Sequence, residues 1–307
     1  MIEDELLKGA IDLHVHGFPE VSLKARPRVD DVELAQLARA AGMRAVVIKN
    51  SLFPTAARAY IITKMVPGIE IFGSVTLNTN LGGLSPFTVE ASGELGAKVV
   101  WMPTWSSRND LIKGGAIMRM LRRFSPSVDQ LLPSPEMGIT VLDGEGRLLP
   151  VVDEILQIMK RYDMIMASSH LSIEESLALA KACHKKGVKF ILTHALNDRV
   201  NASIDQQKEI ASMGGFIEHC YIQTMPLHQK LDIRRIPECI QAVGPENCVI
   251  STDAAFAYDP PAPEVLRMFI GSLLALGIDE NSIIKMVQEN PAKLLGLSLT
   301  EEKEAEI

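Results

Sequence analysis

Two histidines stand one residue apart near the start of the chain. His14 and His16 end the apolar run IDLHVH at residues 11–16. In an extended strand, residues i and i+2 point to the same face, so the two imidazoles project together while Leu13 and Val15 point the other way. Two imidazoles on one face can bind one metal ion, although a solvated turn or a pair of core histidines gives the same pattern. The pair alone therefore leaves the chemistry open.

Three further residues of metal-ligand type end other apolar runs of the chain. His170 ends MIMASSH, His194 ends VKFILTH and Asp253 ends NCVISTD. Neutral imidazoles and a carboxylate suit a divalent cation such as zinc, and an open coordination position holds a water whose pKa falls from 15.7 to about 7. Asp253 could accept a proton from that water. Each histidine taken alone is compatible with a core residue, so the joint placement carries the prediction of a metal site.

Eight short apolar runs alternate with longer amphipathic segments. The candidate metal ligands lie at the ends of these apolar runs, so the arrangement of the runs determines whether the ligands meet. Near-continuous apolar strands that alternate with helices are typical of a parallel sheet covered by helices, and eight such units fit a closed (β/α)8 TIM barrel. An open doubly wound sheet is the alternative, but no glycine-rich phosphate loop follows the first run. In a barrel the C-terminal strand ends meet at one mouth, so residues about 240 positions apart become neighbours. The predicted strands span residues 10–16, 44–50, 69–77, 97–103, 164–170, 188–194, 214–220 and 247–253.

The intervening segments carry helix signals. Gly42 ends a segment with apolar residues at helical spacing, and Gly187 ends a second one. Ser172 is the expected N-cap of that second helix, with Glu175 at the capping-box position. The first stripe consists of Val32, Leu34, Ala35, Leu37 and Ala38.

One segment interrupts the alternation. Residues 104–149 are too long for a simple strand-to-helix loop, and ITVLDGEGRLLP within and just after them predicts a hairpin with DGEG as its turn. We interpret the segment as an insertion over the barrel mouth, where long loops commonly act as lids. The whole chain, 1–307, is then a single domain.

Composition narrows the class of partner. The chain of 307 residues is 47% hydrophobic and 22% charged, which is typical of a globular protein with a sizeable core. Its net charge of -7 provides no basic field for nucleic acid, so a small-molecule substrate is expected. No apolar run approaches the roughly 20 residues of a membrane helix, and the N-terminus lacks the regions of a secretory signal. Because the four cysteines form no CxxC pair, we expect a reducing cytoplasm; a homo-oligomer is compatible with the sequence.

Taken in order, the motifs DLHVH, SSH, LTH and STD resemble the metal-site pattern of the amidohydrolase superfamily. The tail IIKMVQENPAKLLGL at 283–297 resembles the helix and Asn-Pro-Ala segment with which many of these barrels end. Physically, the tail predicts a helix broken before Pro291 and then a short helix whose leucines dock on the barrel. The resemblance implies a metal-dependent (β/α)8 enzyme, usually a hydrolase of amide, ester or related bonds.

The resemblance also implies roles for individual residues. By position, His14, His16 and His170 would be metal ligands. His194 would be a ligand or a group that orients water and substrate, and Asp253 would be a ligand and the general base. The cofactor would be one or two divalent ions, zinc first, with manganese or iron as alternatives.

The fourth predicted strand departs from the family pattern. Many binuclear members carry a bridging lysine or glutamate there, whereas VVWMPTW offers Trp101, Met102 and Thr104. Either the site is mononuclear, or Lys49 at the end of the second strand supplies the bridge. A lysine beside cations would prefer to be neutral or modified. A solvated loop lysine and a lysine that binds a substrate anion are the other interpretations of Lys49.

Four other residues are candidates for the mouth. Glu218 and His219 point to opposite faces of the seventh strand, and we favour Glu218 as the site residue and His219 as core. Asn78, after the third strand, could donate to a substrate oxygen. Arg108, after the fourth, could hold a carboxylate or phosphate in a forked pair, although a surface arginine fits equally well.

The leading prediction is a hydrolase in which metal-activated water attacks a carbonyl or phosphoryl centre. A mononuclear decarboxylase on the same barrel is the first alternative, because it is compatible with the missing fourth-strand ligand. A phosphoesterase of the polymerase-and-histidinol-phosphatase type also opens with HxH, but it normally ends in DxH, and no histidine follows Asp253 closely. A non-catalytic binding barrel is the last alternative.

Overall fold

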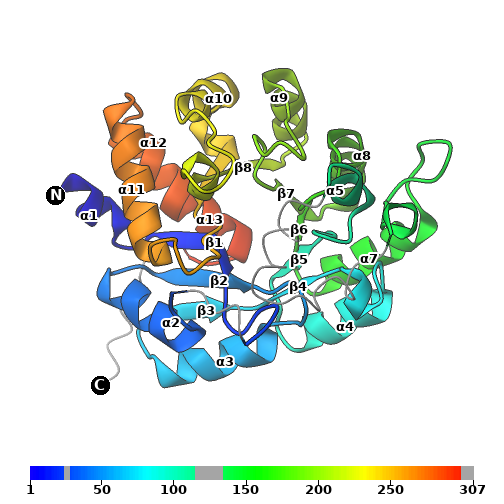
Figure 1. Cartoon of the computed structure of the whole chain (residues 1–307), viewed down its shortest axis with the longest axis horizontal. Helices are drawn as coiled ribbons and strands as arrows, with labels where there is room; N and C mark the ends of the chain where they lie inside the picture. Colours follow the sequence, from blue (N-terminus) through cyan, green and yellow to red (C-terminus); the bar gives the residue numbers. More distant parts are fainter. Residues whose placement is uncertain (24–27, 115–133, 299–307) are drawn as a thin grey trace.

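The computed structural model describes residues 1–23, 28–114 and 134–298, in which parallel strands lie at the centre and helices surround them (Figure 1). Each predicted strand contains an observed one, and the third is divided in two at Gly73. A side chain at Gly73 would collide with the backbone of Ala56, so this position accepts only glycine at the close approach of the chain. The strands are β1 Ile11–His16, β2 Ala45–Lys49, β3 Glu70–Phe72, β4 Ser74–Thr76, β5 Val99–Trp101, β6 Ile165–Ala167, β7 Lys189–Leu192, β8 Phe216–Cys220 and β9 Cys248–Ser251.

The strands pair in parallel in two sheets, β1-β2-β3 and β4-β5-β6-β7-β8-β9. Two joins connect the sheets into a ring. β3 runs into β4 through Gly73, and β1 meets the chain just after β9 through a parallel bridge between Val15 and Ala254. At that second join the Asp253 amide donates to the His14 carbonyl over 2.8 Å. The fold is the predicted (β/α)8 TIM barrel.

The predicted helix signals lie at helix ends: Ser172 and Gly187 cap one helix, and Gly42 directly follows the C-cap of another, whose N-cap, Asp30, was not predicted. Asp30 accepts hydrogen bonds from the amides of Val32 and Glu33 at the start of α2, and Ser172 accepts one from Glu175 at the start of α8. The helices are α1 Ile2–Leu7, α2 Asp31–Ala40, α3 Ala56–Met65, α4 Pro86–Glu94, α5 Arg108–Ile112, α7 Pro150–Arg161, α8 Ile173–Lys186, α9 Ile204–Ser212, α10 Arg235–Val243, α11 Ala262–Ala275, α12 Glu280–Ile284 and α13 Asn290–Leu295. Short 3-10 turns lie at Thr79–Leu81, Pro135–Met137, Tyr221–Thr224 and Pro245–Asn247.

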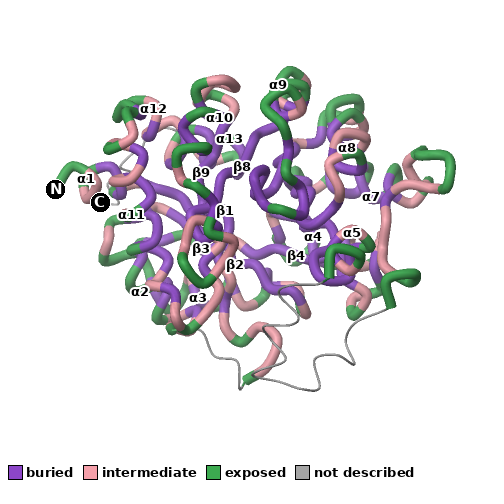
Figure 2. Tube along the Cα trace, turned by 45° about the horizontal axis from the view of Figure 1, so that its top comes forward, coloured by how far each residue is buried: buried purple, intermediate pink, exposed green. Residues whose placement is uncertain are grey.

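Two apolar cores follow from the alternation of strand faces. One packs the outer strand faces against the helices, and the other fills the barrel interior, where α13 contributes Leu294 and Leu295. The buried trace in Figure 2 runs through the strands, whereas exposed positions lie on the helices and loops around them. The interior strand residues are Ile11, Leu13, Ala45, Val47, Val99, Trp101, Ile165, Ala167, Ile191, Phe216 and Val249.

The pairing of β1 with β2 shifts register within the histidine motif. Asp12 pairs with Val46 and Val15 with Ile48, so β1 advances three residues while β2 advances two. An extra residue of this kind reverses the inward-outward alternation and re-aims side chains. The predicted alternation places Leu13 and Val15 on the same face, opposite the two histidines. This prediction is wrong at Leu13, which packs in the barrel interior, whereas Val15 packs in the outer core.

The inserted segment contains the predicted hairpin. Leu142 and Leu148 form an antiparallel bridge, and the Asp143 amide donates to the Arg147 carbonyl over 2.8 Å. Residues 115–133 of the segment lie outside the described residues. A role of the insertion as a lid stays a prediction.

The C-terminal tail docks as predicted but is not broken before Pro291. α12 continues through a π-helical segment, Lys285–Glu289, directly into α13, and Glu289 and Asn290 keep right-handed helical backbone angles. The wider π turn accommodates the proline, which lacks an N–H and would clash with the preceding turn of a regular α-helix. Within the described ranges, no helix combines the length and apolarity needed to cross a membrane.

Candidate metal centre and its cavity

Asp253, which follows β9, contacts both histidines of the β1 motif. Its Oδ1 lies 3.0 Å from His14 Nε2 and 3.1 Å from His16 Nε2. Two donors about 2.1 Å from one tetrahedral zinc ion lie about 3.4 Å apart. Both distances from Asp253 are close to the spacing of two ligands of one cation, which fits the metal site predicted from the sequence.

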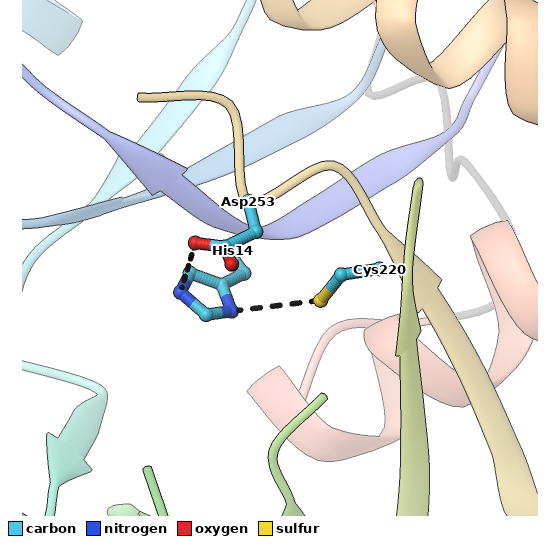
Figure 3. Close-up of side chains that lie close together, drawn as sticks. All are labelled: His14, Cys220 and Asp253. Carbon is cyan, nitrogen blue, oxygen red and sulfur yellow. Dashed lines mark hydrogen bonds and ion pairs between the residues drawn. The ribbon is translucent and has the colours of Figure 1, made fainter. Parts of the chain in front are cut away.

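Figure 3 shows Asp253 and Cys220 on opposite nitrogens of the His14 ring. The Cys220 sulfur is 3.9 Å from Nδ1, and donor atoms of the three residues all lie within 4.8 Å of one another. One imidazole nitrogen binds one ion, and Nε2 is the nitrogen that faces Asp253. Burial raises the pKa of the Cys220 thiol well above its usual value, so it stays protonated. We therefore assign the candidate centre to His14, His16 and Asp253 rather than to the cysteine.

A carboxylate holds each histidine of the motif at its other nitrogen. His14 Nδ1 is 3.2 Å from Glu218 Oε2, and His16 Nδ1 is 2.7 Å from Glu20 Oε1. The Glu20 oxygen also accepts a hydrogen bond from Ser51 over 2.8 Å. A carboxylate that accepts from Nδ1–H fixes the tautomer in which Nε2 has a free lone pair, as in metal-binding histidines.

Glu20 was missed by the sequence reasoning, which favoured Glu218. Glu218 is recognisable because strand alternation places it on the inner face of β8, where it also accepts from the His194 amide over 3.1 Å. Glu20 lies in a loop, and its spacing of four residues from His16 has meaning only inside a helix. Neither a strand nor a helix period marks it.

The electrostatics of this side of the mouth favour a cation. Burial alone would lower the pKa of both motif histidines, but Asp253 raises that of His14, and Glu20 together with Asp253 raises that of His16 to about 9. Burial would raise the pKa of Asp253, yet the two imidazoles hold it well below its usual value. The field that stabilises a proton on the rings also stabilises a divalent ion, which binds the rings in their neutral form.

His170 and His194, after β6 and β7, line the same cavity. His170 Nδ1 lies 3.7 Å from Asp110 Oδ2, beyond hydrogen-bond distance, and His194 forms no ion pair with any described carboxylate. Their ring centres are 5.2 Å apart, and His194 lies 6.1 Å from His14. Both His194 nitrogens are buried without a hydrogen-bond partner among the residues described. Burial lowers the pKa of His170 to about 4 and that of His194 well below its usual value. Both rings are therefore neutral, with lone pairs available to a cation or a substrate.

The strand ends turn sharply at the site. Ser169, His194 and Asp253 have positive φ angles of 52°, 35° and 54°. This left-handed conformation is uncommon for residues with a Cβ and costs of order 1–3 kcal/mol each when the surroundings enforce it. Its recurrence at three strand ends around one cavity is typical of a functional site.

Lys49 is buried beside the centre. Its side chain is 1% exposed, and its Nζ lies 3.0 Å from His14 Nε2 and 4.5 Å from the Trp101 ring centre. Burial lowers the pKa of its ammonium group. These contacts exclude the solvated loop lysine, whereas metal bridging and anion binding remain predictions. Trp101 and Met102 at the end of β5 are fully buried and offer no ligand oxygen.

A cavity of about 560 Å³ opens onto the centre, a size typical of small-molecule sites. Asn78 and Arg108, the other predicted substrate residues, do not line it. Asn78 is buried, and its amide bonds Ser51 and Thr104, which braces two loops. Arg108 is exposed at the start of α5. The cavity instead contains polar residues that the sequence reasoning did not select: Glu20, Asn197, Arg199, Gln223 and His228.

The ring of eight strand positions and the outer helices define a TIM barrel. Solved structures with this fold include an amidohydrolase from Pseudomonas aeruginosa, 16% identical over 95% of this chain and 98% of that chain, with a TM-score of 0.64. The probable dipeptidase PvdM from the same organism is 12% identical over 96% and 97%, also with 0.64. A 2,6-dihydroxybenzoate decarboxylase from Rhizobium is 12% identical over 94% and 99%, with 0.53. At these identities the likeness shows the fold.

No curated protein matches the chain. The model of a family described as "Family of unknown function (DUF6282)" matches residues 9–218, and the chain belongs to that family.

Proposed function

We propose that the protein is a metal-dependent hydrolase that cleaves an amide, ester or related bond of a small molecule with activated water. The observation that carries the proposal is the single Asp253 oxygen at 3.0 and 3.1 Å from the Nε2 atoms of His14 and His16. His170 and His194 supply further nitrogen donors nearby, and Lys49 and Glu218 flank the centre. A divalent ion held there, zinc first and manganese or iron as alternatives, would act as a Lewis acid toward water and a substrate carbonyl.

The residues of the chain divide the remaining tasks. Asp253 is ionised, so it can accept a proton from the attacking water and later return it to the leaving group. His194 is neutral, so one of its unpartnered nitrogens can hydrogen-bond a substrate oxygen or serve as a ligand. Glu218 and Glu20 hold the two motif histidines in one tautomer.

The test combines metal analysis with turnover. We expect the purified protein to contain a transition metal, to lose hydrolysis of a panel of amides and esters on chelation, and to regain it with zinc or manganese. Asp253→Asn should lower kcat/KM by about 10³-fold or more, because general-base and ligand functions are removed together. The exposed Asp205→Asn on α9 is the control. A protein that retains no metal, or whose turnover survives chelation, contradicts the proposal.

A mononuclear decarboxylase is the second candidate. The absence of ligand oxygens at Trp101 and Met102 favours a single ion, and one solved structure with this fold is a decarboxylase. Release of carbon dioxide from aromatic or keto acids, measured on the same metal-loaded protein, separates the two reactions.

We further propose a cytoplasmic location and partners limited to small molecules. The four cysteines, which are buried and unpaired, support a reducing compartment. The acidic net charge of -7 speaks against nucleic-acid binding. Self-association remains a prediction, which sedimentation of the purified protein would test.

A further inference from the structure

Arg199, in the loop after β7, is the buried arginine of the cavity wall. It is 7% exposed and lines the cavity that opens onto the candidate metal centre. Its Nε donates to Asp110 of α5, and its Nη1 donates to Asn197 Oδ1 over 3.0 Å. Its Nη2 has no hydrogen-bond partner in the described part of the chain, yet it is not among the fully buried unpartnered atoms. The Nη2 amino group is therefore at least partly accessible.

The helix α5 fixes the position of Arg199 from two sides. Asp110, 1% exposed, pairs with the guanidinium group behind the cavity wall. The Arg199 carbonyl accepts hydrogen bonds from Asn109 Nδ2 over 3.0 Å and from Lys113 Nζ over 2.7 Å. A guanidinium group held in this way loses little further entropy when it binds a ligand. This preorganisation distinguishes it from the exposed Arg108.

We propose that Arg199 binds a carboxylate of the substrate, which makes the substrate a small carboxylic acid whose reacting bond lies at the His14, His16 and Asp253 centre. The placement of the reacting bond rests on the proposed function, whereas carboxylate binding by Arg199 does not depend on it. A buried ion pair contributes little net stability compared with apolar residues of similar volume. An unpartnered and accessible Nη2 on such a pair, at the wall of a cavity, is explained by a ligand that accepts a hydrogen bond from it.

The local charges favour a singly charged ligand over a phosphate. Asp110 already pairs with Arg199, and an oxygen of Asp198 lies 3.6 Å from Nη1. Glu20 and Asp253 line the same cavity as Asp198 and add two further carboxylates. A dianionic phosphate would meet more repulsion from these groups than a singly charged carboxylate, which can accept a charge-assisted hydrogen bond from Nη2.

The test measures binding by calorimetry, with benzoate and succinate as probes, benzamide as the neutral analogue and phenyl phosphate as the competing anion. Each is titrated into the zinc-loaded and the chelated protein. We expect Arg199→Gln to weaken carboxylate binding about 10- to 100-fold, as for loss of a charged hydrogen bond, and to leave benzamide unchanged. Arg199→Lys should restore part of the affinity. The exposed Arg39→Gln on α2 is the matched control.

The double variant Asp110→Asn with Arg199→Gln keeps the test valid if the single variant unfolds, because it leaves no unpaired buried charge. Unchanged carboxylate binding in the folded variant, no carboxylate binding by the wild-type protein, or tighter binding of phenyl phosphate would overturn the inference. Arg199-dependent binding that persists after chelation, without any hydrolysis, would contradict the proposed function and leave the inference standing.

Discussion

The two sides of the barrel mouth place the same residue type at equivalent strand ends and give it opposite properties. On the β1 and β9 side, His14 and His16 contact Asp253 at 3.0 and 3.1 Å, and their pKa values are raised. On the β6 and β7 side, burial dominates, and the pKa values of His170 and His194 are lowered. The two histidines whose nitrogens both lie at hydrogen-bond distance from carboxylates have raised pKa values. His170, with Asp110 only at 3.7 Å, and His194 follow the effect of burial instead.

The largest expected effect comes from making the same substitution, histidine to glutamine, on each side of the mouth in turn. We expect His14→Gln to weaken zinc binding more than about 100-fold, since it removes a ligand and leaves Asp253 and Glu218 without their common partner. His194→Gln should reduce kcat with a smaller loss of zinc affinity. Chelator competition and steady-state kinetics measure the two effects. Equal losses of zinc affinity would show that the two sides act as one ligand set.

The pH dependence of zinc binding sharpens the comparison. A proton occupies His16 below its raised pKa of about 9, so zinc must displace it at neutral pH. Apparent zinc affinity should therefore rise with pH from 6 to 8, by about tenfold per unit for each proton displaced. His170 and His194 are already neutral in this range and add no slope. Competition titrations, corrected for the chelator's own protonation, give the slope, and a flat profile would contradict the prediction.

Glu20→Gln tests the origin of that slope. The amide keeps a hydrogen-bond acceptor beside His16 Nδ1 but removes the charge that raises the pKa of the ring. We expect a shallower pH profile of zinc binding and a change in affinity of about tenfold. The exposed Glu174→Gln on α8 should leave the profile unchanged.

The smallest effect concerns stability at acidic pH. His219, on the opposite face of β8 from Glu218, is 1% exposed, and burial lowers its pKa to about 4. Its unfolded pKa is near 6.5, so the full contribution to stability is present above pH 6.5 and is lost as the pH falls toward 4. His219→Leu should remove up to roughly 3 kcal/mol of this acid-induced loss. Urea unfolding at pH 7 and pH 4.5, compared with the wild-type protein, measures the difference.

Regular periodicity made most of the fold predictable. Strands with apolar runs and helices with capping boxes, as at Ser172 and Glu175, carry local signals that tertiary structure preserved. The register shift between Asp12 and Val15 and the π-helical turn before Pro291 have no such signal. Both depend on tertiary contacts, and at both places a prediction from regular strand or helix periodicity was wrong.

The candidate site was predictable only where a strand end supplied the side chain. His14, His170 and Asp253 belong to that group, since parallel strands bring their C-terminal ends together. Glu20 and Arg199 come from irregular loops, and Asp110 comes from a short helix of the insertion. Their positions follow from tertiary hydrogen bonds, and distance from a strand end does not identify them: Arg108 follows β5 at the same distance at which Arg199 follows β7, yet only Arg199 lines the cavity.

The bridge between Val15 and Ala254 places the candidate centre on the seam where the first and last strands of the ring meet. During synthesis, His14 and His16 leave the ribosome roughly 240 residues before Asp253, at about 5–20 residues per second. For at least about ten seconds the histidine pair lacks its carboxylate partner. Loading of an ion at the proposed centre would thus be a late event that reports completion of the ring, and a chain truncated before β9 should fold partially but bind zinc weakly.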